Sequence, residues 1–336
     1  MKFLKIIGSV LVVFIICFIV FYLWARRSIV PESEYSVLTT YPVGNSTIIN
    51  DTFSIMTYNI GYLSGMTNNL PVDRPKKLLE ENLEKASQLL LDRKPDIIVF
   101  QEIDFGSQRT YYVNQLDQLA NKCGFPYGAV SVNWDKQYVP FPYWPIRCNF
   151  GEMLSGQAVL SRSPILSNKQ VVLPKPSSNP FYYNDFYLDR LAQVAWISTT
   201  TDSICLINVH FEAWDGPTRE IQSELVLNIY RKYELDHPVI LLGDFNCNPP
   251  FASNALKEKT IERLIAHPTI SMVNQKADYL KNPERYLTFN SEKPYVKIDY
   301  IFYNNLYLEC LDYEVVQEAE DISDHLPVSA VIAIKP

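Results

Sequence analysis

The sequence predicts an α/β domain that is joined to an N-terminal transmembrane helix. Three observations lead to this prediction. Apolar, strand-like segments alternate with amphipathic helical segments from Phe53 onward. The first 27 residues contain a long uncharged apolar stretch. The composition, with 47% hydrophobic and 20% charged residues, is ordinary for a globular protein. A chain of 336 residues can form one large domain or two small ones, and either can bury a sizeable core.

The apolar stretch covers residues 6–25 (IIGSVLVVFIICFIVFYLWA) and is flanked by lysines before it and by Arg26 and Arg27 after it. About twenty apolar residues in a helix span the hydrocarbon core of a bilayer. Tyr22 and Trp24 lie where aromatic side chains meet the membrane–water interface. The alternative is a cleaved secretory signal, but its apolar region would be shorter and followed by small residues. We therefore expect residues 1–27 to be a retained single-pass anchor.

Residues 28–50 are polar, contain two prolines, and are predicted to form a linker to a domain over residues 51–336. Two lysines and two arginines flank the anchor, so the charges leave its orientation open. We expect the domain on the extracytoplasmic side. Residues 28–336 keep all 37 acidic residues but only 26 of the 30 basic ones, which gives a net charge of 26 − 37 = −11. That charge disfavours a nucleic-acid partner, which usually meets a basic surface.

The helices and strands of the domain are predicted from the spacing of its apolar residues. Residues 76–94 place Leu79, Leu83, Ala86 and Leu90 on one face of a helix. Another helix is predicted to start at Pro217 and to turn Ile221, Leu225 and Ile229 toward the next strand. Further helices are predicted at about 107–122 and 252–265, and strands at 53–60, 96–103, 155–161, 190–199, 203–210, 238–243, 296–303, 307–315 and 327–334.

Two segments, residues 136–150 and 176–189, are dense in proline and aromatic residues and fit no regular element. One interpretation is ordinary loop packing. The other is a rim that faces substrate, since aromatic side chains provide a large and rigid contact area. Under the second interpretation Tyr143 and Trp144 are candidate substrate contacts.

Polar residues interrupt the predicted strands at their ends. In VILLGDFNCNPP, an apolar strand runs directly into an Asp and an Asn two residues apart, which point the same way if the chain stays extended. A simple turn also uses Asp and Asn, so this segment alone leaves both possibilities open. The same pattern recurs along the chain at Asn59, Gln101, Glu102, His210, Asp244, Asn246, Asp299, Asp324 and His325. The other two histidines, His237 and His267, each precede a proline and are predicted to lie in turns.

Side chains at strand ends converge on one edge of a layered sheet protein, and buried carboxylates need a cation to neutralise them. Carboxylate and amide oxygens favour a hard cation such as Mg²⁺ or Mn²⁺. Five cysteines lie outside the anchor without any CxxC spacing, so neither a zinc site nor a full disulfide framework is indicated. The set suits hydrolysis of a phosphate ester, in which a cation polarises the phosphoryl oxygen and a carboxylate or histidine activates water.

The ordered motifs TYNIG, QEID, SGQAVLSR, NVHFEA, GDFNCNP, KIDYIF and SDHLPV resemble the endonuclease/exonuclease/phosphatase superfamily over residues 53–334. The resemblance implies the DNase I-like fold, a four-layered α/β sandwich of two packed mixed sheets flanked by helices. It also implies Mg²⁺-dependent phosphoester hydrolysis.

The resemblance also implies roles for individual residues. Three residues would hold the metal: Glu102 as the principal ligand, Asn59 near the metal and phosphate, and Asp324. Five residues would be catalytic: Asp244 at the attacking water, Asn246 at the phosphate, His210 at the transition state, and Asp299 paired with His325. Abasic-site endonucleases carry a Tyr at the position of His210, so that activity is disfavoured.

The anchor, the acidic domain and the aromatic segments favour a substrate at the bilayer, such as the headgroup diester of a phospholipid or phosphosphingolipid. NVHFEA is similar to the corresponding strand of neutral sphingomyelinases. One alternative is a membrane-anchored nuclease, for which Arg162, Arg190 and Arg219 are the candidate basic residues. Arg190 is also predicted as a substrate-binding residue, although it could be structural. The other alternative is a catalytically silent binding module, against which the complete site set argues. No protein partner is predicted.

Overall fold

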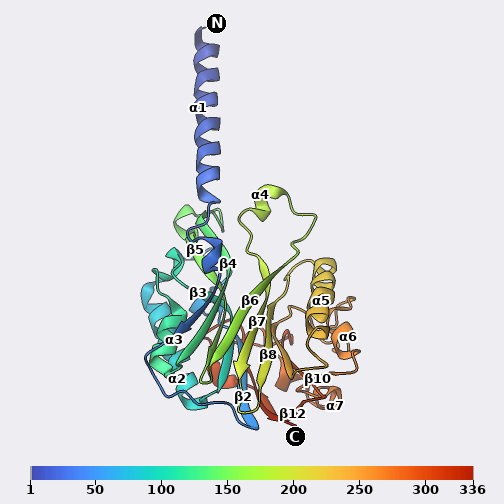
Figure 1. The fold of residues 1–336 in the computed structure, drawn as a ribbon. Coiled ribbons are helices and arrows are strands. Elements are labelled where there is room, and N and C mark those ends of the chain that lie inside the picture. Colours follow the sequence, from blue (N-terminus) through green and yellow to red (C-terminus); the bar gives the residue numbers. More distant parts are fainter. Residues whose placement is uncertain (1, 336) are drawn as a thin grey trace.

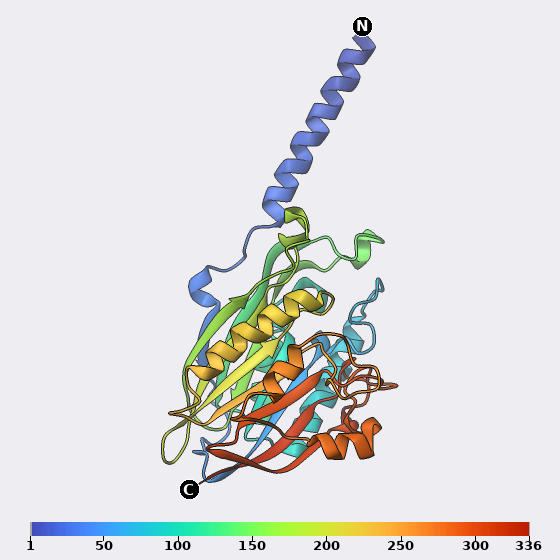
Figure 2. The ribbon, with the colours of Figure 1, turned by 90° about the vertical axis from the view of Figure 1, so that its right-hand side faces the viewer.

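Two mixed β-sheets pack face to face, and helices cover their outer faces (Figure 1). The computed structural model describes residues 2–335. The first sheet has the order β1–β4–β5–β3–β2–β13–β12 and the second the order β10–β11–β9–β8–β7–β6. Helices α2 and α3 lie on the outer side of the first sheet, and α5 and α6 lie on that of the second (Figures 1 and 2). This arrangement confirms the predicted four-layered fold.

The elements have the following bounds. The first sheet consists of β1 (Ser36–Thr40), β2 (Thr52–Asn59), β3 (Ile97–Asp104), β4 (Tyr127–Val139), β5 (Gly151–Ser161), β12 (Leu308–Val315) and β13 (Val328–Ile334). The second consists of β6 (Ile165–Leu173), β7 (Arg190–Ser198), β8 (Ser203–His210), β9 (Val239–Asp244), β10 (Ile270–Met272) and β11 (Asp299–Asn304). The helices are α1 (Lys2–Ala25), α2 (Lys76–Arg93), α3 (Gln115–Cys123), α4 (Phe181–Asn184), α5 (Gly216–Arg231), α6 (Thr260–Ile265) and α7 (Lys276–Lys281).

Strand β9 is buried on both faces, and its alternation divides its side chains between two cores. Ile240 and Leu242 belong to the cluster between the two sheets. Val239 and Leu241 belong to the cluster that contains Val226 of α5. A strand covered on both faces has no polar side, which explains its uninterrupted apolar run.

Each sheet contains one parallel pair, β2–β3 in the first and β8–β9 in the second. The register of these pairs places Asn59 opposite Gln101 and His210 opposite Asp244. Strand β11 is antiparallel to β9, so its first residue, Asp299, also lies opposite Asp244. The polar strand ends therefore converge, as the sequence predicts.

The buried face of α5 differs from the prediction. Ile221 is 54% exposed and Leu225 is also exposed, whereas Gln222, Val226 and Tyr230 are buried. The inward face includes a polar residue that makes specific bonds: the Gln222 amide donates to the carbonyl of Pro174 (2.7 Å) and accepts from the backbone N–H of Glu212 (2.7 Å). Ile229, the third predicted residue, does pack against the core. Because the buried position 222 is polar, apolar periodicity was wrong for the other two. The predicted face of α2 is confirmed, with Leu79, Ala86 and Leu90 buried.

The bounds of several helices and strands in the structure also differ from the predicted ones. The helix predicted at about 107–122 is α3, preceded by a short 3₁₀ turn at Gln108–Thr110. The helix predicted at 252–265 is reduced to α6, because turns occupy most of residues 250–258. Strands β1, β4, β6 and β10 were not predicted. All six cysteines are free.

The prediction of a linker over residues 28–50 is wrong for a large part of that segment. Strand β1 pairs antiparallel with β4 at the edge of the first sheet. Before it, the Asp135 carboxylate accepts hydrogen bonds from the backbone N–H groups of Ile29 (2.6 Å) and Val30 (3.2 Å) and from the hydroxyl of Tyr35 (2.9 Å). The chain between α1 and the domain is therefore held in place.

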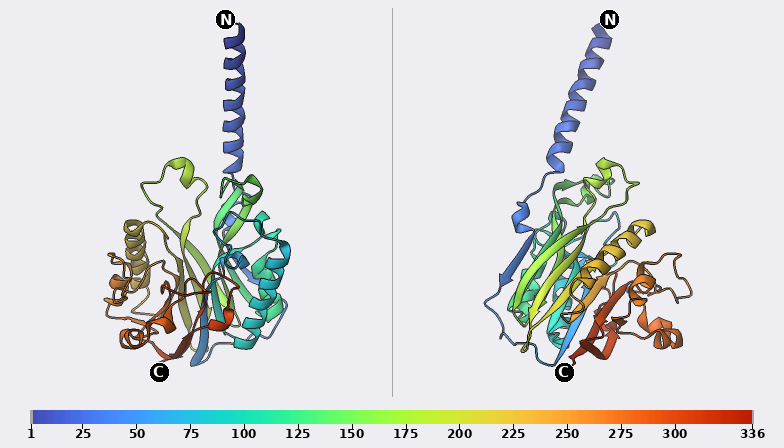
Figure 3. Two further views of the ribbon diagram at one scale, coloured as in Figure 1. Left: turned by 180° about the vertical axis from the view of Figure 1, so that it is seen from behind. Right: turned by 45° about the vertical axis from the view of Figure 1, so that its right-hand side comes forward.

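Helix α1 projects away from the domain, and among residues 2–335 it is the one helix long and apolar enough to cross a membrane (Figure 3). Its last turn rests on the domain. The rings of Phe21 and Trp24 contact that of Tyr138, with centroids 5.7 and 6.3 Å apart. Arg26 forms an ion pair with Asp185 at 2.9 Å, and the Tyr22 hydroxyl donates to the same carboxylate.

Candidate active site

The residues at the end of β9 form a turn and also lie at the centre of the site. Gly243 has φ +135°, and a Cβ there would lie 2.0 Å from the carbonyl oxygen of Val209, so only glycine allows β8 and β9 to approach. One Asp244 oxygen accepts from the backbone N–H of Asn246 (2.9 Å), which closes an Asx turn. Asn246 has φ +49° and its amide donates to the carbonyl of Phe211 (3.0 Å), so the chain does not stay extended. The turn interpretation of GDFN is therefore confirmed, whereas the extended geometry over Asp244 and Asn246 is not formed.

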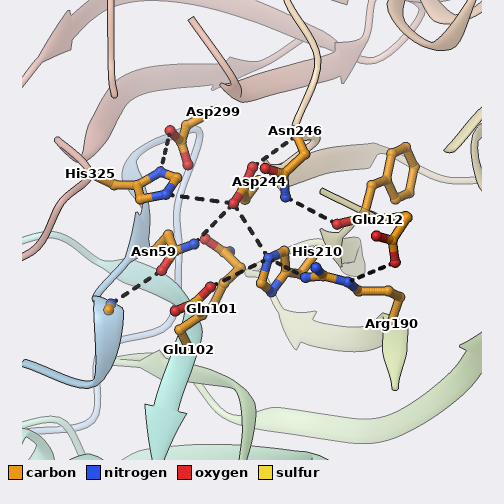
Figure 4. A network of polar contacts seen from close by, with 12 residues as sticks. Asn59, Gln101, Glu102, Arg190, His210, Glu212, Asp244, Asn246, Asp299 and His325 are labelled. Atoms are coloured by element: carbon orange, nitrogen blue, oxygen red, sulfur yellow. Dashed lines mark hydrogen bonds and ion pairs between the residues drawn. The ribbon is translucent and has the colours of Figure 1, made fainter. Parts of the chain in front are cut away.

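Asp244 lies among three polar side chains (Figure 4). Its Oδ2 accepts from the Asn59 amide at 2.9 Å and lies 3.5 Å from Nε2 of His210 and 3.9 Å from Nε2 of His325. Burial, and then the neighbouring Asp299 carboxylate, raise the pKa of Asp244 to about 7. A carboxylate with such a pKa can accept a proton near neutral pH.

His325 and Asp299 form the predicted pair. Nδ1 of His325 lies 3.0 Å from an Asp299 oxygen. Burial alone would lower the pKa of His325, but the carboxylates of Asp299 and Asp244 outweigh it and raise the pKa to about 10. The imidazole is therefore protonated. Lys297 is buried behind the pair and donates to the backbone carbonyl of Asp299 (2.9 Å), and burial lowers the pKa of this lysine to about 7.

His210 is neutral. Nη1 of Arg190 lies 2.5 Å from Nε2 of His210, and because a guanidinium only donates, Nε2 is the acceptor. Burial and then the Arg190 charge hold the pKa of His210 well below its ordinary value. Arg190 is itself buried, with Nε 3.7 Å from Glu212, whose carboxylate accepts from the hydroxyl of Tyr187 (2.9 Å). Arg190 thus both lines the cavity and positions His210.

Glu102 enters the site through a break in the β3–β5 ladder. The register shifts between Phe100 and Ile103, and Glu102 has φ +52°. This bulge turns the carboxylate toward the cavity, where it accepts from the Asn68 amide at 2.7 Å. Burial raises the pKa of Asp324 to about 6, and the Glu102 carboxylate contributes to the rise.

The residues present fit a divalent cation. Asp244, Asp299 and His325 offer ligand atoms that lie within 4.8 Å of one another, and one buried oxygen of Asp299 has no hydrogen-bond partner. Carboxylates crowded in this way suit a hard cation. Glu102, predicted as the principal ligand, lies beside this cluster, with one carboxylate oxygen 3.7 Å from Nε2 of His210. The amide of Asn59, a residue predicted near the metal, donates to Asp244 of this group.

A cavity of about 830 Å³ opens beside these residues. Beside the polar residues of the site, its wall contains eleven aromatic side chains: Tyr62, Trp134, Phe141, Tyr143, Phe150, Tyr183, Phe186, Tyr187, Trp214, Phe289 and Tyr295. Tyr143 is therefore placed where the sequence predicts a substrate contact. Trp144 is exposed and does not belong to the wall, so its predicted role there is not supported.

The basic residues proposed for nucleic acid are engaged elsewhere. The Arg162 guanidinium donates to backbone carbonyls, including that of Pro95 (3.2 Å), and Arg219 forms a buried ion pair with Glu258 (2.8 Å). The two arginines of the cavity wall, Arg109 and Arg190, are buried beside Asp104 and Glu212.

Four site residues were not predicted. Glu212 follows His210 by two positions and Lys297 precedes Asp299 by two, so a wider search around each strand end would have found them. Asn68 and Arg109 lie in loops and reach the site only through the tertiary fold, and no sequence signal marks them.

The sequence pattern of the Endonuclease/Exonuclease/phosphatase family matches residues 56–325. The chain belongs to this family. Its members are nucleases and phosphatases, so the chain is a phosphoester hydrolase by family. No match is found among curated proteins.

Solved structures of the family share the fold at low identity. An endonuclease/exonuclease/phosphatase from Beutenbergia cavernae is 18% identical, with a TM-score of 0.60 over 84% of this chain and 72% of that one. The human nocturnin catalytic domain with bound sulfate is 16% identical, with a TM-score of 0.58 over 89% and 98%. A mannosyl-6-phosphatase from Bacteroides thetaiotaomicron is 17% identical, with a TM-score of 0.57 over 84% and 99%. At these identities they support the fold and leave the substrate open.

Proposed function

We propose that this endonuclease/exonuclease/phosphatase domain is a membrane-anchored phosphodiesterase that uses Mg²⁺ or Mn²⁺ to hydrolyse the headgroup ester of a phospholipid or phosphosphingolipid. The observation that carries the proposal is the aromatic cavity beside the cluster of carboxylates and histidines. Such a wall provides apolar contact area for an amphiphile, and the cluster provides the chemistry of ester hydrolysis.

The residues have distinct tasks. Asp244, with a pKa of about 7, accepts a proton from the attacking water. His325, protonated and held by Asp299, donates a hydrogen bond from Nε2 to the phosphate. Arg190 adds a fixed positive charge next to His210. Glu102 and Asp324 would hold the divalent cation, which supplies charge neutralisation at the phosphoryl oxygens.

A lipid is favoured over nucleic acid because, within residues 2–335, the arginines that line the cavity are already paired with carboxylates. A protein that tracks a phosphate backbone neutralises it with accessible lysines and arginines. Here the wall arginines are already paired, and Arg162 and Arg219 are engaged elsewhere. The extracytoplasmic placement of the domain remains our expectation, which protease treatment of intact cells would test.

The test is hydrolysis by the full-length chain in detergent–lipid micelles, with Mg²⁺ or with EDTA. Sphingomyelin, phosphatidylinositol phosphates, a phosphomonoester, and single- and double-stranded DNA are compared side by side. The variant His325→Ala should lower kcat/KM by at least about 100-fold, since it removes a charged hydrogen-bond donor to the phosphate. His237→Asn, a change in a turn outside the site, is the matched control. Hydrolysis of DNA alone would refute the lipid assignment and identify an anchored nuclease.

A further inference from the structure

Two loops expose large apolar side chains at the end of the domain from which α1 leaves (Figure 1). We call them rim loop 1 (residues 140–150) and rim loop 2 (residues 174–189). At their tips, Trp144 is 76% exposed, Ile146 63%, Phe181 73% and Tyr182 58%. Exposed apolar patches of this kind mark an interaction surface on a soluble domain.

We propose that the two rim loops insert into the interfacial region of the bilayer that holds α1, and that they set the mouth of the cavity against the membrane surface. This inference rests on the anchoring role in the proposed function. It adds a second, peripheral membrane contact made by the catalytic domain itself.

The docking of α1 fixes the position of both loops relative to the membrane. Tyr138, which packs against Phe21 and Trp24, lies just before rim loop 1. Asp185, which pairs with Arg26, belongs to rim loop 2. The last turn of the apolar helix therefore touches rim loop 2 directly and contacts the strand residue that precedes rim loop 1. Figures 1 and 2 show that α1 and both loops lie at the same end of the domain.

The chemistry of the tips suits a bilayer interface. Trp, Tyr and Phe concentrate where hydrocarbon meets headgroups, because each has an apolar body and the first two carry a polar edge. Arg27 follows α1 within two residues, is exposed and can meet lipid phosphates. In water, the side chains of Trp144 and Phe181 would expose a large apolar area without any contact.

The same loops also form part of the cavity wall. Phe141 and Tyr143 of rim loop 1 and Tyr183 and Phe186 of rim loop 2 line it. The loops that would enter the bilayer therefore also border the cavity that would receive an amphiphile.

The first test reads membrane depth without turnover. The full-length chain is placed in phosphatidylcholine vesicles, with or without bromine atoms near the start of the acyl chains, and quenching of tryptophan fluorescence is measured. Trp144→Phe should remove a quenched component of the emission. Trp196→Phe is the matched control, because Trp196 lies six residues along β7 from Arg190, about 20 Å from the site end. Equal quenching in Trp144→Phe and wild type would overturn the proposal.

The second test compares substrates. Phe181 and Ile146 do not line the cavity. The double variant Phe181→Ser/Ile146→Ser should lower turnover of vesicle lipid by about tenfold or more and leave turnover of a soluble, monomeric phosphodiester unchanged. If the loops instead form a lid over bound substrate, both activities fall and bromine does not quench Trp144, which would contradict membrane insertion. If the enzyme hydrolyses no lipid at all, the quenching result still decides the inference independently of the proposed function.

Discussion

Asp244 shows how one residue can serve the fold and the chemistry together. Its Oδ1 closes the turn after β9, and its Oδ2 receives the Asn59 amide and faces both histidines. The two histidines differ in charge because their neighbours differ. His210 meets a guanidinium and is neutral, whereas His325 meets two carboxylates and is protonated. The Asp244 carboxylate therefore lies between a neutral imidazole, His210, and a positively charged one, His325.

Burial of Lys297 makes the stability of the fold depend on pH. Burial lowers its pKa to about 7 from 10.5, so between those pH values the unfolded chain binds one more proton at this position than the folded chain does. Stability contributed by this group therefore rises with pH over that window, with a slope of up to about 1.4 kcal/mol per pH unit. We expect the stability of wild type relative to Lys297→Met to increase from pH 7 to pH 10.

Thermal unfolding of both proteins in EDTA over this range measures the effect. Lys122→Met is the control, because Lys122 is exposed and paired with Glu84 on the surface. A stability difference between wild type and Lys297→Met that does not change with pH would show that the lysine titrates normally.

The site could be predicted from the sequence where its residues end strands. Strand ends are marked by an abrupt change from apolar to polar residues, and the topology of a mixed sheet brings them together. Asn68 could not be predicted in this way. It lies in a loop between β2 and α2, and its 2.7 Å bond to Glu102 exists only because the bulge in β3 turns that carboxylate outward.

At the scale of elements, the approach of β8 and β9 depends on Gly243. An added methyl would lie 2.0 Å from the carbonyl oxygen of Val209, and the positive φ disfavours any other residue. We expect Gly243→Ala to destabilise the protein by more than about 2 kcal/mol, because the clash is with backbone and cannot be relieved by a side-chain rotation. Chemical denaturation measures it. Gly8→Ala is the control and should cost far less, since nothing lies within 4 Å of its added methyl.

The segment between α1 and β2 was predicted poorly for a physical reason. Its polar composition is that of a linker, but its order comes from partners about a hundred residues away, above all Asp135. Long-range pairing of this kind leaves no local signal. The prediction of the buried face of α5 failed for a related reason. A glutamine can be buried in place of an apolar residue when its side chain has hydrogen-bond partners, as Gln222 does.

This tethering of the segment can be tested directly. Asp135→Ala removes the acceptor for two backbone N–H groups and the Tyr35 hydroxyl. We expect faster cleavage at Glu32 and Glu34 by a glutamate-specific protease, because the segment must leave the domain surface to enter the protease. Asp202→Ala, on an exposed turn, is the control. Unchanged cleavage would mean that pairing of β1 with β4 alone holds the segment.

At the scale of the whole molecule, the site is a concentration of buried negative charge inside an otherwise well-packed domain. Asp244 and Asp299 are buried at strand ends of the second sheet, and Glu102 of β3 and the buried Asp324, which precedes β13, come from the first sheet. Charges of one sign oppose folding when they are desolvated together. Burial of these carboxylates therefore lowers the free energy of unfolding of the domain, and a bound cation would offset this loss.

The resulting prediction links the site to global stability. Mg²⁺ should raise the thermal midpoint of the full-length chain, by an amount equivalent to about 2.7 kcal/mol when its concentration is one hundred times the dissociation constant. For a domain of this size that is on the order of five degrees or more. Glu102→Gln should respond much less to Mg²⁺, because it loses a proposed ligand, and its metal-free form should be no less stable than wild type, because Glu102 and Asp324 no longer repel each other. Glu284→Gln, an exposed change outside the cavity, should keep the full response. Equal Mg²⁺ responses in Glu102→Gln and wild type would exclude Glu102 as a ligand and direct the search to Asp244 and Asp299, where the oxygen without a partner lies.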